Sequence, residues 1–278
     1  IISLIFSFYR GINFFTLELI GILLRLFQSL GEINRTIGMV INSQVHLEKL
    51  YVVEKNKKSV NKNNYEIKEI DSKFAVIFKN VSFKYIGSEE LIFDNLSFKI
   101  NKNQHTIITG ENGSGKSTIL GLIAGVYFPI DGKVSSYSDK YGYVGPNPLI
   151  IKGTLKDNLI YGSKKEFDDT ILENFVFEFQ LFKESKENIL DTKVSNKDLS
   201  SGQMQKISLI RALVLEPEIL ILDEAFSNLD TNSRELISKK LNQKKITIIN
   251  STHSVIELNY DNHLSIEISK GQRKLVER

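Results

Sequence analysis

A glycine-rich run of eight residues sets the strongest limits on how this chain can fold: Gly110-Glu111-Asn112-Gly113-Ser114-Gly115-Lys116-Ser117. It directly follows the apolar run 105–109 and directly precedes the apolar-periodic residues 118–123. A strand, a glycine loop and a helix in this order fit the pattern G-x-x-x-x-G-K-[ST], which cradles the phosphates of a nucleoside triphosphate. The alternative is a glycine-rich turn that matches the pattern by chance, and the flanking strand and helix patterns argue against it.

Each part of this loop contributes to binding a triphosphate. Glycines let the backbone wrap closely, so that successive N–H groups point at phosphate oxygens, and the start of a helix adds partial positive charge. Lys116 is expected to reach the β- and γ-phosphates, and the Ser117 hydroxyl is expected to bind Mg²⁺. The predicted ATP-binding residues of this segment are Gly110, Glu111, Asn112, Gly113, Ser114, Gly115, Lys116, Ser117 and Thr118.

The composition allows one or two folded units. The chain has 278 residues and is 41% hydrophobic, which is enough to bury a sizeable core. Its net charge of +3 is nearly balanced, so we expect no polyanion and no nucleic acid as a partner. It has no cysteine, which excludes disulfides and thiolate metal sites. Because the sequence starts with Ile1 inside an apolar run, we expect it to be the C-terminal piece of a longer protein.

Residues 14–30 predict a transmembrane helix. With their flanks they approach the roughly 20 residues that cross a hydrocarbon core. Glu18 and Arg25 would each cost about 2.5–3.5 kcal/mol at mid-membrane, but seven residues apart they share one helix face and could line a bundle interior. A buried helix of a soluble core is the alternative. A signal peptide is disfavoured, because no small-residue cleavage site follows.

The remaining N-terminal sequence predicts how the chain is divided. Residues 32–54 keep apolar positions at helical spacing, which indicates a helix that runs on out of the membrane. The segment 55–64 is polar and rich in lysine, as expected of a linker on the cytoplasmic side. We therefore predict three parts: the end of a transmembrane domain at 1–54, a linker at 55–73 and a nucleotide-binding domain at 74–278.

From Phe74 onward the pattern alternates between strands and helices. Helix is predicted after the glycine loop, through most of 154–182, and from the capping residues Ser200 and Ser201 to Leu215. The excess of Phe within 154–182 is interpreted as core. Alternation of this kind predicts the α/β class. The predicted strands are 75–78, 81–85, 91–100, 105–109, 141–144, 218–222, 246–250 and 264–268.

Two carboxylates follow the apolar strand that ends at Leu222. Such an edge presents ligands in a parallel sheet, although strands often end in acidic caps for structural reasons alone. Together with the glycine loop, Asp223 is expected to hold Mg²⁺ and Glu224 to polarise the attacking water. His253 follows the strand 246–250 and could contact the γ-phosphate, while a lone histidine is more often structural. The predicted catalytic residues are Glu224, His253 and Lys116.

A second diagnostic stretch is Leu199-Ser200-Ser201-Gly202-Gln203. Here the chain resembles the ATP-binding cassette (ABC) family, whose signature L-S-G-G-Q completes the ATP site of an opposing subunit. The resemblance covers about Phe74 to the C-terminus, and the motifs occur in the family's order. It implies a P-loop ABC-type nucleotide-binding domain with antiparallel β and helical subdomains, preceded by a transmembrane helix. The motifs are Tyr85, the glycine loop, the signature, Asp223-Glu224, Ser227-Asn228-Leu229-Asp230 and His253.

The resemblance also implies ligands and partners. Tyr85 would stack on adenine, Ser200, Gly202 and Gln203 would contact the partner's ATP, and 227–230 would cross the interface of a homo- or heterodimer. The sequence of residues 153–159 and the preceding membrane helix resemble the export-type branch of the family. ATP and Mg²⁺ are the implied cofactors. A second ABC subunit and membrane lipid are the implied partners, with the protein in the cell membrane and its ATPase domain in the cytoplasm.

The chain departs from the family pattern beside the strand 141–144. The family's glutamine, which approaches Mg²⁺ and the lytic water, is replaced by Pro146, or by Asn147 if the alignment slips by one residue. The predicted metal residues are therefore Ser117, Asp223 and Asn147. Ser201 replaces a signature glycine, and the stretches 192–198 and 134–141 are shorter than usual.

These residues favour the ATP-hydrolysing subunit of an export-type ABC half-transporter. One alternative is a regulatory cassette that binds ATP with little hydrolysis, and it is supported by the altered glutamine region. The other is a soluble ABC ATPase without transport, which the apolar stretch 14–30 disfavours. The sequence does not identify the transported substrate.

Overall fold

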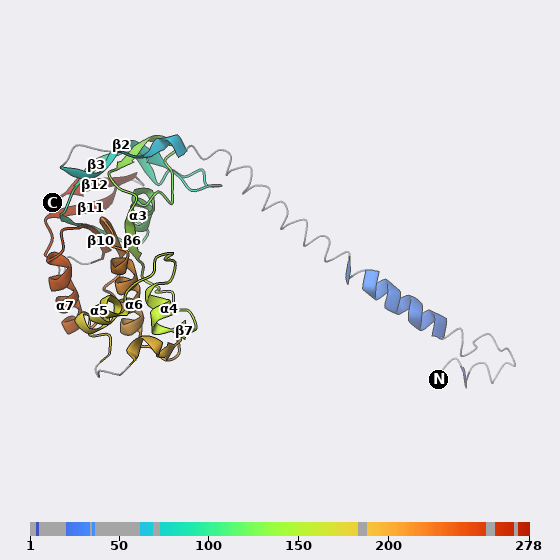
Figure 1. Ribbon diagram of the computed structural model, residues 1–278. Helices are drawn as coiled ribbons and strands as arrows, with labels where there is room; N and C mark the ends of the chain where they lie inside the picture. The colour runs from blue at the N-terminus through green and yellow to red at the C-terminus, as the bar shows by residue number, and fades with distance from the viewer. Residues whose placement is uncertain are drawn as a thin grey trace. The chain divides into compact units, whose positions relative to one another are not determined.

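The computed structural model describes residues 4–5, 21–33, 35–36, 62–68, 73–182, 188–253, 259–269 and 272–278. The chain divides into two compact units, Ile1–Val60 and Asn61–Arg278 (Figure 1). Residues 14–20 of the predicted span, 37–54 of the predicted helical extension and most of the predicted linker lie outside the described residues. None of the described helices combines the length and the apolar character that crossing a bilayer requires.

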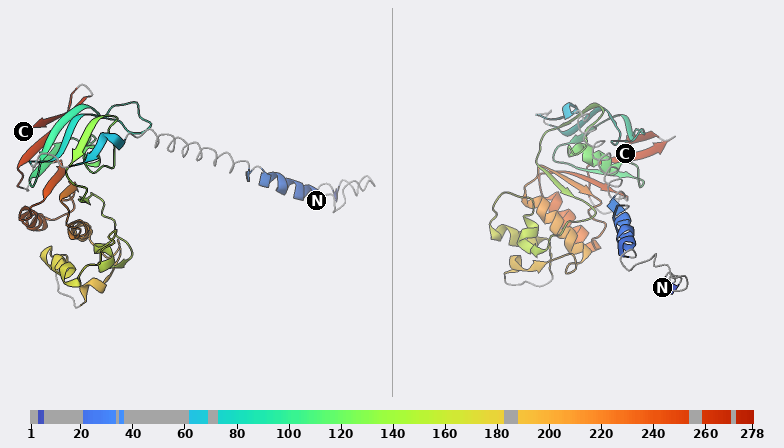
Figure 2. Two further views of the ribbon diagram at one scale, coloured as in Figure 1. Left: turned by 45° about the horizontal axis from the view of Figure 1, so that its top comes forward. Right: turned by 90° about the vertical axis from the view of Figure 1, so that its right-hand side faces the viewer.

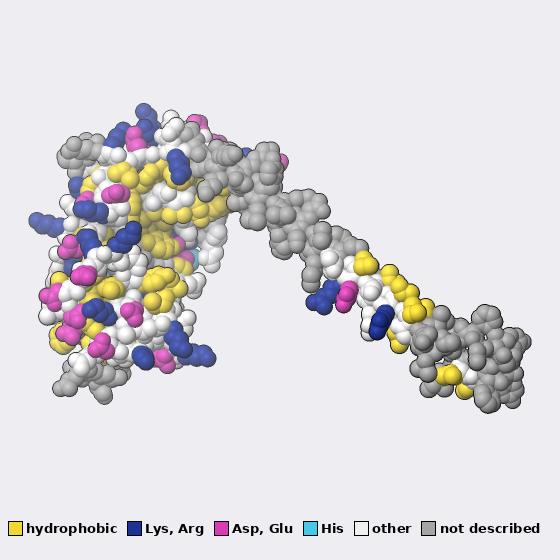
Figure 3. All heavy atoms as spheres, turned by 45° about the vertical axis from the view of Figure 1, so that its right-hand side comes forward, with side chains coloured by type: hydrophobic (Ala, Val, Ile, Leu, Met, Phe, Trp, Pro, Cys, Tyr) yellow, Lys and Arg dark blue, Asp and Glu magenta, His cyan; other side chains and the backbone are white. Residues whose placement is uncertain are grey.

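In the N-terminal unit, residues 21–33 form a helix. Its large apolar side chains are exposed, and several of them lie side by side in the space-filling view (Figure 3). A helix in water usually buries one apolar stripe. This helix therefore presents an apolar surface that finds no cover within the described part of its own unit. The exposed residues are Ile22, Leu23, Leu24, Leu26, Phe27, Leu30 and Ile33.

The C-terminal unit is built on a six-stranded sheet with the order β12-β11-β4-β10-β9-β6. All neighbouring strands are parallel except β11 and β12, which form a hairpin. The carboxyl ends of the parallel strands therefore meet at one edge of the sheet, where open α/β sheets bind ligands. The strands are β4 (His105–Gly110), β6 (Tyr141–Val144), β9 (Ile219–Asp223), β10 (Thr247–Thr252), β11 (Asn262–Ser269) and β12 (Gln272–Glu277).

A second sheet has the order β1-β5-β2-β3. The antiparallel pairing of β5, β2 and β3 confirms the predicted antiparallel subdomain, and β1 is added parallel to β5. The strands of this sheet are β1 (Tyr65–Ile67), β2 (Phe74–Phe83), β3 (Phe93–Asn101) and β5 (Asp131–Ser136), after the short 3₁₀ helix η1 (Lys62–Asn64). The predicted strands 75–78 and 81–85 are one strand, β2, whose pairing is irregular around Asn80, a residue with φ +49°. β1 lies within the range 55–73 and pairs with β5.

Helices pack on the sheets of this unit. Several of them form a separate group away from the antiparallel sheet, which we call the helical end (Figures 1 and 2). The predicted helical stretch 154–182 is broken into two helices, because Gly162 turns with φ +86° and Asp168 caps a new start. The elements are α3 (Lys116–Ile123), β7 (Gly153–Thr154), α4 (Leu155–Leu159), α5 (Asp169–Glu178), η2 (Ile189–Asp191), β8 (Lys193–Val194), α6 (Ser201–Val214) and α7 (Thr231–Asn242).

The strand β9 separates two hydrophobic cores. Successive side chains of a strand point to opposite faces of the sheet. Ile219 and Ile221 accordingly pack with α3 and the antiparallel sheet. Leu220 and Leu222 pack with α4 to α7. Because β9 is buried on both faces, the position of Asp223 at its end is firmly set.

Candidate functional site

The loop between β4 and α3 needs glycine at particular positions. Gly115 has φ +103°, and a Cβ there would lie 2.6 Å from Cζ of Phe93. A Cβ on Gly110 would lie 2.7 Å from Oγ of Ser114 and 2.9 Å from the carbonyl oxygen of Ile266. A side chain fits neither place, since real Cβ atoms do not approach other atoms that closely. The loop is thus held in the open, wrapped shape that its sequence predicts.

Lys116 lies inside this loop and is buried. Its Nζ donates to the carbonyl oxygens of Gly110 at 2.9 Å and Glu111 at 3.1 Å. Burial lowers the pKa of Lys116 and outweighs the opposing effect of the Glu224 and Asp223 charges. The Oγ of Ser114 is buried without a hydrogen-bond partner among the described residues. A buried cation beside an unsatisfied hydroxyl suits an anion with several oxygens, as a triphosphate has.

Asp223 is buried at the end of β9, and both of its carboxylate oxygens accept hydrogen bonds. Oγ of Ser251, from β10, donates to Oδ1 at 2.5 Å, and Oη of Tyr143, from β6, donates to Oδ2 at 3.3 Å. Burial, followed by the charge of Asp223, raises the pKa of Tyr143 to about 12, so the phenol stays a donor at neutral pH. Neither Ser251 nor Tyr143 was predicted from the sequence to be part of the site.

Glu224 follows in the left-handed backbone region, with φ +53°. This conformation is strained for a residue with a side chain, and such strain is concentrated at functional sites. The backbone N–H of Glu224 donates to the carbonyl oxygen of Ser251 at 3.0 Å, which fixes the turn against β10. The turn directs the Glu224 carboxylate toward His253 at the end of β10.

His253 lies between Glu224 and Lys116. Its Nε2 is 2.6 Å from Oε1 of Glu224, and its Nδ1 is 3.4 Å from Nζ of Lys116. One neutral tautomer satisfies both contacts, since Nε2–H donates to the carboxylate and Nδ1 accepts from the ammonium group. The structure therefore brings together all three side chains that we predict to be catalytic.

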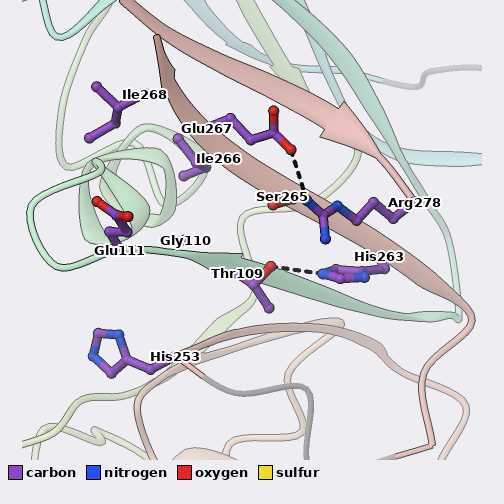
Figure 4. A pocket seen from close by; sticks show the side chains of 10 residues that line it. All are labelled: Thr109, Gly110, Glu111, His253, His263, Ser265, Ile266, Glu267, Ile268 and Arg278. Atoms are coloured by element: carbon purple, nitrogen blue, oxygen red, sulfur yellow. Dashed lines mark hydrogen bonds and ion pairs between the residues drawn. The ribbon is translucent and has the colours of Figure 1, made fainter. Parts of the chain in front are cut away.

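Beside these residues is a pocket of about 640 Å³ (Figure 4). Glu111 and His253 line one part of it, and β11 lines the other. Across the pocket, Nε2 of His263 lies 2.7 Å from Oγ1 of Thr109, which tethers β11 to β4. Burial, followed by the charge of Arg278, lowers the pKa of His263. The outer side of the glycine loop is therefore open to a large ligand or to another chain.

Tyr85 lies at the other end of the phosphate loop. Its Oη is 2.6 Å from Oγ1 of Thr118 in the first turn of α3. Its ring packs edge-on against Phe83 at 5.2 Å and Tyr127 at 5.6 Å between centroids, and it is 40% exposed. An exposed aromatic ring anchored beside the loop is suited to stacking on a base. Tyr127 was not singled out from the sequence, where nothing distinguishes it from a core tyrosine.

The residues Ser200, Gly202 and Gln203 lie at the start of α6, as predicted. Ser200 is the N-cap, and its Oγ accepts from the backbone N–H of Gln203 at 3.2 Å. Oε1 of Gln203 accepts from the backbone N–H of Ser200 at 2.9 Å, which completes a capping box. Among the described residues, no hydrogen bond joins this helix start to the phosphate loop of the same chain.

The segment after β6 is held in place by hydrogen bonds to its backbone carbonyl oxygens. The carbonyl oxygen of Gly145 accepts from Nε2 of Gln205 at 3.0 Å, and that of Pro146 accepts from Nδ2 of Asn228 at 3.3 Å. Asn147 is exposed, and its role at a metal stays a prediction. Ser117 is also exposed, in the first turn of α3. In the described parts of the chain, no three His, Cys, Asp or Glu side chains form a metal site of their own.

The phosphate loop lies between β4 and α3, and the acidic end of β9 lies two strands away from β4 in the same sheet. Together these features define a P-loop nucleotide-binding domain. Residues 93–227 match the family described as ABC transporter. The ATP-dependent permease MDL1 of Candida albicans is 32% identical over 216 residues, which are 70% of this chain and 32% of that protein. The ABC transporter B family member 17 of Arabidopsis thaliana is 36% identical over 61% of this chain and 15% of its own length.

A solved structure has the same fold. It is described as the structure of a bacterial Atm1-family ABC exporter with ATP bound. It matches with a TM-score of 0.64 and 24% identity, over 74% of this chain and 39% of that one. The region 93–227 belongs to the ABC transporter family, whose cassette domain binds ATP. The chain spans between 15% and 39% of the length of these three proteins.

Proposed function

We propose that this chain is the ATP-hydrolysing subunit of an ABC exporter, and that ATP binding and hydrolysis between two cassettes drive transport of a substrate across the membrane. The observation that carries the proposal is the contact of His253 with both Glu224 and Lys116. A carboxylate at the mouth of a phosphate loop can accept a proton from the attacking water, and an ammonium group in the loop can bind the phosphates.

Each of these groups has a defined task. Lys116 exchanges the loop carbonyls that it now contacts for the oxygens of the β- and γ-phosphates, because a charged acceptor binds an ammonium group more strongly than a carbonyl does. Glu224 orients the attacking water and accepts its proton. His253 holds Glu224 in place and faces the γ-phosphate. Mg²⁺, when bound by Ser117 and Asp223, supplies positive charge at the phosphate oxygens.

Adenine recognition is assigned to Tyr85. The support is its exposed ring and its hydrogen bond to Thr118, which belongs to the first turn of α3. The N–H groups and side chains of residues 110–118 receive the phosphates. The Mg²⁺ ligands are Ser117 and Asp223, and Asn147 is a candidate third residue.

A second subunit is proposed to complete each site. The start of α6 makes no hydrogen bond to its own phosphate loop among the described residues, and Ser200 is exposed there. Ser200, Gly202 and Gln203 are therefore available to the ATP of another cassette, and Ser227 to Asp230 to the surface between the two cassettes. The partner is a second ABC subunit, either identical or different.

The membrane part is proposed to comprise residues 1–54, followed by a linker at 55–73 and the cassette at 74–278. The support is the helix at 21–33, whose exposed side chains include Ile22, Leu26 and Phe27. Hydrocarbon is a better environment than water for such a surface. With membrane lipid as a partner, the protein is placed in the cell membrane with its cassette in the cytoplasm. The similar solved structure is that of an exporter, which is consistent with this direction of transport.

A regulatory cassette is the second candidate, and one observation favours it. Pro146 has no polar side chain to offer the lytic water, and its carbonyl oxygen is engaged by Asn228. A cassette of this kind would bind ATP tightly and hydrolyse it slowly. The groups at Lys116, Glu224 and His253 favour the hydrolytic function over this one.

The proposal that two subunits form each ATP site is tested by complementation between two inactive variants. Lys116→Ala disables the phosphate loop, and Gly202→Asp adds a charge to the start of α6. Mixed in equal amounts, the two variants form dimers with one intact composite site, so we expect about a quarter of the wild-type ATPase activity to return. Specific activity of the wild type should also rise with protein concentration. A wild type that is active without complementation between the variants would contradict the proposed dimer.

A further inference from the structure

The strand β6 brings a phenol to the buried carboxylate at the end of β9. Tyr143 pairs in register with Ile221, and Asp223 comes two residues later on the same face of the sheet. Oη of Tyr143 donates to Oδ2 of Asp223 at 3.3 Å. The other oxygen, Oδ1, accepts from Ser251 at 2.5 Å. The carboxylate is thus held from both neighbouring strands, β6 and β10.

Holding both oxygens fixes the plane of the carboxylate. A carboxylate has about four lone-pair directions, so two of them stay available after these hydrogen bonds. Without Tyr143, the group would keep Ser251 alone and could rotate about that single contact. Groups that orient a metal-binding carboxylate in this way commonly raise metal affinity 10- to 100-fold.

The neighbouring segment offers no replacement for the phenol. Pro146 has no polar side chain, and the carbonyl oxygens of Gly145 and Pro146 are engaged by Gln205 and Asn228. Asn147 is exposed, and no described residue forms a hydrogen bond with it. Tyr143 is therefore the polar side chain of 143–147 that reaches the acidic end of β9 in the described structure.

We propose that Tyr143 is a positioning residue for the metal, and that its hydroxyl orients Asp223 for Mg²⁺. The inference rests on the proposed function, because that function makes Asp223 a metal residue. The phenol also has lone pairs that can accept a hydrogen bond from a water molecule on the metal.

The test is the affinity for Mn²⁺, measured by electron paramagnetic resonance of the 278-residue chain with a non-hydrolysable ATP analogue. Tyr143→Phe removes only the hydroxyl, and it is tolerable because the residue is 55% exposed. We expect Mn²⁺ affinity to fall about 10-fold, while affinity for the analogue in EDTA stays unchanged. Ser251→Ala removes the other support of Asp223 and should also weaken Mn²⁺ binding.

Tyr141→Phe is the matched control on the same strand. Its hydroxyl contacts Ser136 at 2.5 Å and Tyr65 at 2.8 Å, so its loss should lower stability and leave Mn²⁺ affinity unchanged. Equal Mn²⁺ affinity of Tyr143→Phe and the wild type would overturn the inference, as would an equal loss in the control. If the wild type shows no Mn²⁺ binding that depends on the nucleotide, the proposed function itself fails, and the inference with it.

Discussion

Oε1 of Glu224 lies 2.6 Å from Nε2 of His253, although the two residues directly follow different strands, β9 and β10. The contact exists because β9 and β10 are parallel neighbours and because Glu224 turns with φ +53°. Nδ1 of the same imidazole faces Lys116 at 3.4 Å. The orientation of the predicted base is thus linked to the residue that binds the phosphates.

Removing this imidazole should slow hydrolysis more than it weakens ATP binding. His253→Ala leaves Glu224 without its hydrogen-bond donor, so we expect kcat to fall about 100-fold, within the range that a positioned general base contributes. Nucleotide affinity should change less than threefold. His263→Gln is the control, because His263 contacts Thr109 and has no hydrogen bond to Glu224. An equal loss of kcat in both variants would show that the effect is not specific to the Glu224 contact.

Two glycines of the phosphate loop should respond differently to alanine. Gly113 has φ +76° and open space around a Cβ, so Gly113→Ala should cost only backbone strain, about 1–2 kcal/mol. Gly115→Ala adds a collision with Phe93 to comparable strain. We expect at least 10-fold weaker ATP binding in Gly115→Ala than in Gly113→Ala, measured by fluorescent-nucleotide titration. Equal affinities would contradict the tight packing of the loop on β3.

Glu66 should make the stability of the cassette depend on acidic pH. Burial by itself raises its pKa, but hydrogen bonds from Lys133, Lys68 and Ser135 outweigh burial and bring the pKa to about 2. Because the folded pKa lies below the unfolded one, this stabilisation is complete above about pH 4.5 and is lost as the pH falls toward 2.

The measurement is urea unfolding of the wild type and Glu66→Gln between pH 3 and pH 7. The difference in free energy of unfolding should be largest at pH 7 and should shrink toward pH 3. Glu89→Gln, at an exposed residue without an ion pair to any described side chain, is the control. A difference between wild type and Glu66→Gln that is constant over this range would disprove the assignment.

Two phenylalanines near the end of α5 test whether the aromatic residues of this region form a core. Phe179 is fully buried in the helical end, so Phe179→Ala should lower the free energy of unfolding by about 3–5 kcal/mol. Phe177 is 79% exposed, and its replacement by Ala should change stability by no more than about 0.5 kcal/mol. Denaturant unfolding of both variants measures this, and equal losses would contradict the packing.

Much of the architecture could be predicted because local patterns determine it. The glycine loop with Lys116, the apolar strand before Asp223 and the N-cap at Ser200 each depend on neighbouring residues, and the structure confirms these elements. The break at Gly162 and the pairing of β1 were not predicted. The first needs the backbone conformation of a single glycine, and the second depends on β5, which is far along the chain.

The contacts within the site could not be predicted, because they depend on how strands are ordered in the sheet. The sequence gives no sign that β6 and β10 flank β9, and this order is what brings Tyr143 and Ser251 to Asp223. A tyrosine in an alternating strand looks the same whether it covers a core or reaches a carboxylate. The left-handed backbone conformation at Glu224 could not be predicted either, because the residue is not a glycine.

Hydrolysis of ATP with Glu224 as the base is tested by measuring phosphate release and nucleotide binding together, in the 278-residue chain with Mg²⁺ and in its Glu224→Gln variant. The proposal predicts steady phosphate release by the wild type. It predicts at least a 100-fold loss in Glu224→Gln, whose ATP affinity is retained. ATP binding by the wild type without phosphate release, or release that persists in Glu224→Gln, would contradict it.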